Sequence, residues 1–318
     1  MTSFRVFQEA AGHGQEAAAD GGGQAAHAAE QAAHAAEGGG PDIGGMLMHH
    51  LVDAHEIELP GTIIHLPQWE PLHVAGLTID LSPTKHVVFL VLAAILCALL
   101  FIAVGRAIAR KYRDQAPSGL ANALEAIILY FRDEIVRRNI GHGADAFTPF
   151  ILTLFFFILI MNLLGLVPFG ATATGNLSVT AGLAVVSLIV IEVSGFLVLG
   201  PGGYAKTIFY APKGMGPVGS TLMLVIMTPV ELVGKLAKPF ALAIRLFANM
   251  TGGHTVILAL LGLIFVFGHL TLGRWGVAAG SVGMSIAMML LEIFVAFLQA
   301  YIFAMLTSVF IGLIRHAH

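Results

Sequence analysis

Long apolar segments that carry almost no charge are the feature that most restricts how this chain folds. Five of them run through about residues 86–104, 147–168, 177–199, 221–268 and 276–314. About 20 residues of α-helix cross the roughly 30 Å hydrocarbon core of a bilayer, so each segment is long enough to span it or nearly so. Only 11% of the residues are charged, against roughly a quarter in soluble domains. We therefore expect an all-α, multi-pass membrane protein with about five membrane helices, formed by residues 86–318.

The residues before the first span show no membrane pattern. Residues 1–45 are rich in Ala, Gly, His and Glu, repeat the unit QAAHAAE in tandem, and are expected to form a mobile, low-complexity tail. Residues 46–85 contain four prolines and are expected to form an extracytoplasmic segment on the membrane surface. Metal binding by histidines of this region is an alternative to a solvated linker, although no pair has the context of a formed site: His13, His27, His34, His49, His50 and His55.

Basic residues indicate which ends of the spans face the cytoplasm. They follow the first and the third span, namely Arg106, Arg110, Lys111, Arg113, Lys206 and Lys213. By the positive-inside rule, the N-terminal tail is then extracytoplasmic and, after five spans, the C-terminus is cytoplasmic. Residues 119–138 place apolar side chains at helical spacing with charges between them, which predicts an amphipathic helix on the cytoplasmic surface. The N-terminus lacks a signal-peptide pattern, so we expect no cleavage.

The last two apolar segments are too long for helices that stand perpendicular to the membrane. At about 1.5 Å per residue, a helix from Gly276 to Ile314 would extend for about 58 Å, nearly twice the thickness of the hydrocarbon core. Membrane helices tilt by only about 20° on average. Each segment must therefore be steeply tilted, bend within the membrane, or consist of two spans with a hidden turn.

Each of these long segments carries its polar residues on one face. At about 100° per residue, four of them in the first segment fall within about 40° of one another, namely Glu231, Lys238, Arg245 and Asn249, and Lys235 lies at their edge. The second aligns Ser281, Ser285, Glu292 and Gln299 in the same way. A charge that faces lipid costs about 2.5–3.5 kcal/mol even on the lenient insertion scale, so these faces must contact protein or water. The two polar faces together predict a buried polar pathway.

Some of these charges have a structural alternative. Glu231 and Lys235 stand four residues apart, the spacing of a helical ion pair. Glu192 in the third span is open to the same two interpretations, a pathway residue or half of a structural pair. Arg245 has no acidic residue within a helical turn, and its guanidinium stays protonated at physiological pH. We therefore expect Arg245 to meet an anion on another chain.

Three motifs resemble subunit a of F-type ATP synthases. The strongest is ELVGKLAKPFALAIRLFANMTGGH, which runs from Glu231 to His254 and includes Arg245. The others are LQAYIFAMLT at 298–307 and NLLGLVP at 162–168. The resemblance covers about residues 83–314 and is most specific around Arg245; it does not include the tail.

The resemblance implies a role for most of the polar residues. Arg245 would face a rotating ring of c subunits, favour the ionised form of each ring carboxylate, and prevent protons from passing straight through. Asn249, His254, Glu292 and Gln299 would line the half-channel from the outer side. Glu231 would lie in the half-channel toward the cytoplasm. Further candidates for the proton pathway, not assigned to either half-channel, are Glu192, Lys235, Ser281 and Ser285. The resemblance also implies relatives with an acid at the position of His254 and an imidazole at the position of Glu292. Compared with such relatives, this chain has the two side-chain types exchanged.

The same resemblance implies the setting of the chain. The expected partners are the c-subunit ring, the peripheral-stalk b subunits, the rest of the complex and the lipid bilayer of a bacterial plasma membrane. No cofactor, metal or nucleic acid is expected. The chain has no phosphate-binding loop of the form GxxxxGK[ST], so we expect it to move protons rather than make ATP itself.

Three other classes of membrane protein compete with this interpretation. A secondary transporter or ion channel would favour internal repeats with paired broken helices, and the sequence shows no such repeat. A proton-pumping subunit of a respiratory complex would carry Lys and Glu on several central helices without a membrane arginine. A structural scaffold would leave Arg245 unexplained.

Overall fold

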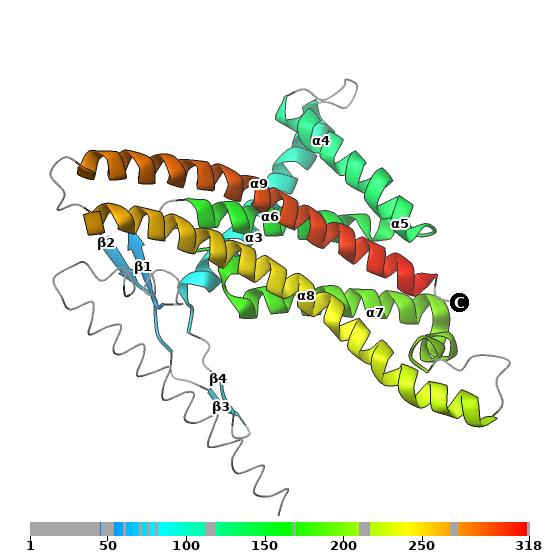
Figure 1. Ribbon diagram of the computed structural model, residues 1–318. Coiled ribbons are helices and arrows are strands. Elements are labelled where there is room, and N and C mark those ends of the chain that lie inside the picture. Colours follow the sequence, from blue (N-terminus) through cyan, green and yellow to red (C-terminus); the bar gives the residue numbers. More distant parts are fainter. Residues whose placement is uncertain are drawn as a thin grey trace, which may run out of the picture. The chain divides into compact units, whose positions relative to one another are not determined.

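The computed structural model describes residues 45, 54–59, 62–69, 72–74, 77–79, 82–111, 119–167, 170–209, 217–267 and 273–316. The predicted tail, apart from Gly45, lies outside these residues with His13, His27 and His34, and so do His49 and His50 of the segment that follows it. The chain divides into two compact units, one of which contains Asp53–His254 and Ala287–His318. Thr255–Ile286 belongs to the other unit. All packing described below lies within the first unit (Figure 1).

Five long helices carry the apolar segments, as the sequence predicts. They are α3 (Lys85–Lys111), α6 (Thr148–Leu166), α7 (Leu177–Ile208), α8 (Pro217–Val266) and α9 (Gly273–Arg315). Each contains a stretch that is long and apolar enough to cross a membrane. The chain is therefore an all-α, multi-pass membrane protein.

The two longest segments are each a single helix. No turn divides α8, which has 50 residues, or α9, which has 43. The alternative of two spans joined by a hidden turn is therefore wrong for both. Pro229 and Pro239 lie inside α8, where a membrane helix tolerates proline because neighbouring helices satisfy the freed backbone groups. Helices of this length must lie inclined or bend to remain within a bilayer.

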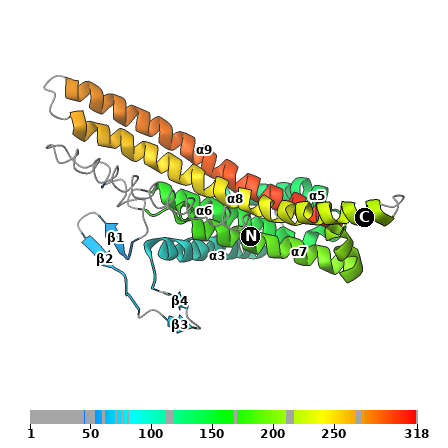
Figure 2. The same ribbon diagram turned by 60° about the horizontal axis from the view of Figure 1, so that its bottom comes forward.

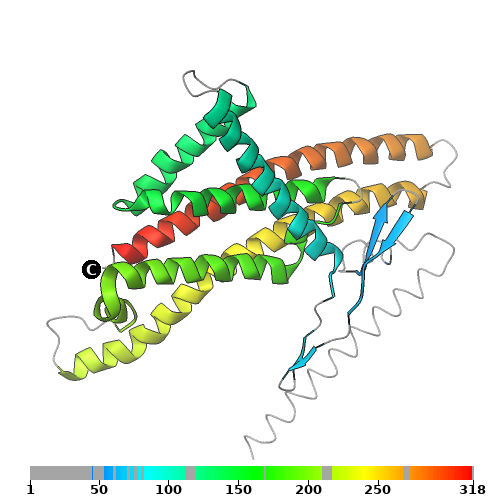
Figure 3. The same ribbon diagram turned by 180° about the vertical axis from the view of Figure 1, so that it is seen from behind.

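The centre of the first unit is α6, which is apolar on every side. Ile151, Phe155, Ile158 and Met161 on this helix are completely buried. Helix α3 crosses α6 (Figure 3), and Phe101 meets Phe156 edge to face with ring centroids 5.2 Å apart. This core holds the polar helices α7, α8 and α9 around a fixed element.

The predicted amphipathic helix is present, with one irregular stretch. It comprises α4 (Leu120–Tyr130), the π-helix η1 (Phe131–Arg137) and α5 (Arg138–Ile140). Its apolar face packs on protein, since Phe131 contacts Phe155 of α6 and Tyr301 of α9. In the π-helical stretch, the carbonyl oxygen of Ile135 accepts a hydrogen bond of 3.2 Å from the Ser308 hydroxyl. The helix thus supports α9, and its place on the membrane surface remains a prediction.

Two short hairpins precede α3, where the sequence indicated only a proline-rich surface segment. β1 (Glu56–Leu59) pairs antiparallel with β2 (Thr62–His65), and β3 (Leu72–Val74) pairs with β4 (Leu77–Ile79) (Figure 2). The backbone amide of Lys85 donates to the carbonyl oxygen of Ala54, which ties the first hairpin to the start of α3. The prolines lie outside the paired residues, so they do not interrupt either ladder.

Glycines allow α9 to approach its neighbours at backbone distance. A Cβ at Gly312 would lie 2.0 Å from the carbonyl oxygen of Asn139 at the end of the amphipathic helix. A Cβ at Gly195 of α7 would lie 2.7 Å from Cγ1 of Ile314. Small residues at such positions are the usual means of close helix packing in membranes.

We expect Gly312→Ala to destabilise the protein by about 1–3 kcal/mol, the typical cost of overpacking. The clash is with a backbone carbonyl, which cannot rotate away as a side chain would. The measurement is thermal unfolding of the purified chain in detergent. Gly105→Ala in α3 is the matched control, because nothing lies within 4 Å of its Cβ position. Equal stability of the two variants would contradict the close contact.

Candidate functional site

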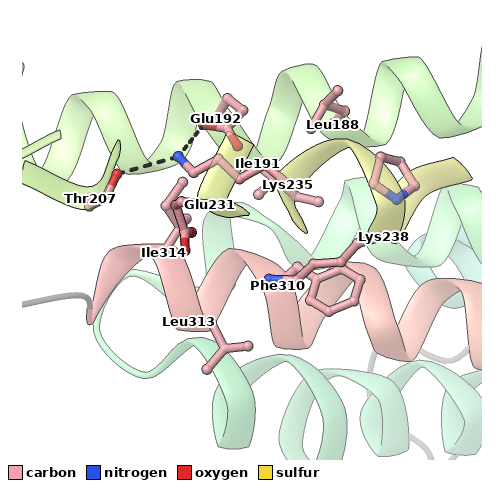
Figure 4. A pocket seen from close by; sticks show the side chains of 11 residues that line it. Leu188, Ile191, Glu192, Thr207, Glu231, Lys235, Lys238, Phe310, Leu313 and Ile314 are labelled. Carbon is pink, nitrogen blue, oxygen red and sulfur yellow. Dashed lines mark hydrogen bonds and ion pairs between the residues drawn. The ribbon is translucent and has the colours of Figure 1, made fainter. Parts of the chain in front are cut away.

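Helices α7, α8 and α9 enclose a polar cavity of about 120 Å³ (Figure 4). Four charged side chains line it, two acidic and two basic: Glu192, Glu231, Lys235 and Lys238. Its other walls include Ile191 of α7 and Phe310 of α9. The cavity therefore collects the first half of the α8 polar face together with the membrane carboxylate of α7.

Lys235 forms an ion pair inside this cavity, but its partner is not Glu231, the residue four positions before it. Its ammonium nitrogen lies 3.2 Å from Oε2 of Glu192, and the two side chains are only 11% and 23% exposed. It also donates a hydrogen bond of 3.3 Å to the Thr207 hydroxyl. Among the described residues, no ion pair joins Lys235 to Glu231. The structural pair that their spacing allowed is therefore not formed, because α7 brings another carboxylate, that of Glu192, to Lys235.

Glu192 is held by α7 itself as well as by Lys235. The Tyr204 hydroxyl donates a hydrogen bond of 2.5 Å to Oε2 of Glu192. The ring of Tyr204 lies under the Lys235 ammonium, 4.7 Å from nitrogen to ring centroid, a favourable cation–π distance. Neither Tyr204 nor Thr207 stood out in the sequence, because both lie in the helical turns that close the third span.

Arg245 is exposed, and no ion pair or hydrogen bond to it is found among the described residues. One turn further along α8, Asn249 donates a hydrogen bond of 3.1 Å to Oε1 of Gln299 on α9. Gln299 is only 2% exposed. The predicted polar faces of α8 and α9 therefore meet at this pair, and Arg245 stands beside it on the open side of the helix.

Glu292 lies against the backbone of α8. A Cβ at Gly253 would be 1.9 Å from Oε1 of Glu292, so a larger residue there would displace this carboxyl group. Glu292 is 5% exposed, and its two oxygens accept no hydrogen bond from any residue that the structure describes. His254, the next residue of α8, is half-buried. Gly252 and Gly253 remain helical, so they do not break α8.

Ser281 and Ser285 lie on α9 within the other unit. They therefore do not belong to the polar group around Gln299 as described here. Their place in a polar pathway stays a prediction from their spacing.

A buried asparagine fixes α9 next to this polar group. Asn162 of α6 is completely buried and donates a hydrogen bond of 3.3 Å to the carbonyl oxygen of Ala296. Its Oδ1 accepts a hydrogen bond of 2.7 Å from Thr174. Ala296 lies between Glu292 and Gln299, so this contact sets the position of both. The motif at 162–168 was visible in the sequence, but its partner was not.

Comparison with known proteins decides the family of the chain. The ATP synthase A chain family matches residues 87–312. The chain belongs to this family. The ATP synthase subunit a of Chloroherpeton thalassium is 46% identical over 84% of this chain and 75% of that protein. The ATP synthase subunit a 2 of Chlorobaculum tepidum is 43% identical, over 85% and 72%. The ATP synthase subunit a of Anaeromyxobacter dehalogenans strain 2CP-C is 44% identical, over 87% of this chain and 73% of that protein.

Membership of the ATP synthase A chain family agrees with the architecture. A multi-pass protein with five long apolar helices fits a membrane subunit of the complex. The family resemblance predicted from the three motifs is therefore confirmed, and with it a part in ATP synthesis and proton transport.

Gly253→Ala should impair ATP-driven proton pumping by at least about tenfold, since displacement of a reacting group by about 1 Å is enough for such losses. The added methyl group must push aside the carboxyl group of Glu292. Pumping is measured in inverted vesicles that contain the assembled complex. The neighbouring Gly252→Ala is the matched control, because nothing lies within 4 Å of its Cβ position. If both variants pump like the wild type, the position of Glu292 is unimportant.

Proposed function

We propose that this chain is the stator subunit of the membrane sector of an F-type ATP synthase and forms two aqueous half-channels against a rotating ring of c subunits. Protons reach the ring from one half-channel and leave it by the other, so their flow turns the rotor. A proton that crosses about 100 mV releases about 2.3 kcal/mol. The chain moves protons and has no catalytic site of its own in this proposal.

The observation that carries the proposal is the exposed Arg245. A guanidinium within a membrane helix is costly unless an anion or water meets it. Among the described residues no carboxylate pairs with it, whereas Lys235, a largely buried charge of the same helix, has its carboxylate in this chain. A c subunit with a membrane carboxylate supplies the missing anion. Arg245 would favour the ionised form of that carboxylate and so release its proton.

The half-channel from the outer side is assigned to the polar group on α8 and α9. Asn249 and Gln299 are already hydrogen-bonded across the two helices. Glu292 has no hydrogen-bond donor among the described residues, and a buried carboxyl group of this kind is suited to exchange a proton with water or a neighbour. His254 supplies an imidazole, a side chain that can both accept and donate a proton.

The half-channel toward the cytoplasm is assigned to the cavity that contains Glu231. Glu231 lines this cavity, is exposed, and makes no ion pair within the described part of the chain. Glu192 lines it too, but its carboxylate is held by Lys235 and Tyr204. We therefore assign proton exchange to Glu231 and a structural role to Glu192.

The orientation follows from the basic residues after α3 and α7. With these ends in the cytoplasm of a bacterial cell, the tail is extracytoplasmic and the C-terminus cytoplasmic. The partners in this arrangement are the c ring, the peripheral-stalk b subunits and the surrounding lipid.

Arg245→Ala should abolish ATP-driven proton pumping, because the ring carboxylate then keeps its proton at the interface. Pumping is followed with a pH-sensitive dye in inverted vesicles, and assembly of the complex is checked on a native gel.

Arg106→Ala is the control, an exposed arginine near the end of α3 that lies outside both proposed half-channels. It should assemble and pump like the wild type. Normal pumping by an assembled Arg245→Ala complex would refute the proposal and favour a transporter that uses another route.

A further inference from the structure

Helix α7 bends just before its last two turns. Gly200 has φ 67° and ψ 172°, outside the helical region, and Pro201 follows it. The segment Pro201–Ile208 is therefore not bound to the rest of α7 by an unbroken series of helical hydrogen bonds. Something else has to hold it in place.

Lys235 of α8 contacts α7 on both sides of this bend. Glu192, its ion-pair partner, precedes Gly200. Its other two partners follow Pro201. Thr207 accepts its hydrogen bond, and Tyr204 provides the ring for its cation–π contact. Figure 4 shows the ammonium between Glu192 and Thr207 at one end of the cavity. Tyr204 closes the group by donating its own hydrogen bond back to Glu192.

We propose that Lys235 is a positioning residue that fastens the segment Pro201–Ile208 to α8 and to the first part of α7, and so keeps the cavity beside Glu231 closed at this end. The importance of the cavity for proton exchange rests on the proposed function above. The fastening itself is a property of this chain alone.

The chemistry of the group fits this task. An ammonium has three donor hydrogens, and Lys235 directs its nitrogen to one carboxylate, one hydroxyl and one aromatic ring. Removal of the ammonium would leave the carboxylate of Glu192 buried without its cation, which favours water entry or movement of the segment. Lys238 lines the same cavity but contacts only the ring of Phe310, 5.2 Å away, among the described residues. Its charge therefore cannot replace that of Lys235.

The fastening can be tested by thiol reactivity at Ile191, which lines the cavity and is 7% exposed. In a Cys97→Ala background, Ile191→Cys introduces a single reporter thiol into the full chain. Inverted vesicles that hold the assembled complex are treated with a water-soluble, membrane-impermeant methanethiosulfonate reagent. The reporter should react slowly while Lys235 is present.

Lys235→Met should raise the reaction rate of the reporter at least roughly tenfold, a factor that the loss of a hydrogen bond to a charged group is sufficient to produce. It should also slow ATP-driven pumping. Lys235→Arg keeps a cation that reaches Glu192, and should bring both values back toward those of the wild type. Lys206→Met is the matched control, an exposed lysine of the same segment, and should change neither.

Unchanged reactivity in an assembled Lys235→Met complex would overturn the proposal. If that variant fails to assemble, Thr207→Val decides, because it removes the hydrogen bond from Lys235 to the segment beyond the bend. Its other effect is local, the loss of the hydrogen bond from the Thr207 hydroxyl to the carbonyl oxygen of Tyr204 within the same segment. A smaller increase in reactivity then supports the fastening, and no increase overturns it. The thiol readout does not depend on proton flow. Normal pumping by Arg245→Ala would therefore overturn the half-channel proposal without affecting the result at Ile191.

Discussion

The cost of a charge in hydrocarbon decides how α7, α8 and α9 are arranged. Each ionisable side chain in a membrane segment needs a partner of opposite charge, a hydrogen-bonding neighbour or water. Lys235 and Glu192 satisfy each other within the chain. Arg245, Glu231 and Glu292 do not find an ion-pair partner among the described residues. This division separates charges that hold the helices together from charges that are free to meet a proton or a second chain.

The positions of the unpaired groups depend on close packing of α9. Gly253 leaves space for Glu292 on α8, Gly195 leaves space for Ile314 on α7, and Gly312 lies against the backbone of Asn139. The hydrogen bond from Asn162 to the carbonyl oxygen of Ala296 adds a fixed point between Glu292 and Gln299. These four contacts restrict how α9 can slide and rotate against its neighbours, and the hydrogen bond between Asn249 and Gln299 then aligns the polar faces of α8 and α9.

Periodicity and hydropathy were sufficient to predict the five membrane helices, the amphipathic helix and the polar faces of α8 and α9, which meet at Asn249 and Gln299. These features follow from rules that act within one helix. The partner of Lys235 could not be predicted, because spacing indicates only the nearby Glu231, whereas Glu192 reaches Lys235 only after α7 packs on α8. The position of Glu292 against Gly253 was missed for the same reason, since it depends on a contact between two helices. The hairpins before α3 were missed although their paired strands are close in sequence.

Lys235 and Arg245 share one face of α8, and their side chains suit different tasks there. A guanidinium is weakly hydrated and stays charged without a partner, so Arg245 can face an interface whose anion arrives and leaves. An ammonium is strongly hydrated, and its burial is stabilised by a permanent carboxylate. Glu192 is that carboxylate, and Tyr204 restricts its movement. The same polar face can therefore serve two purposes. The lysine suits a fixed joint to α7, and the arginine suits a contact surface for the proposed moving partner.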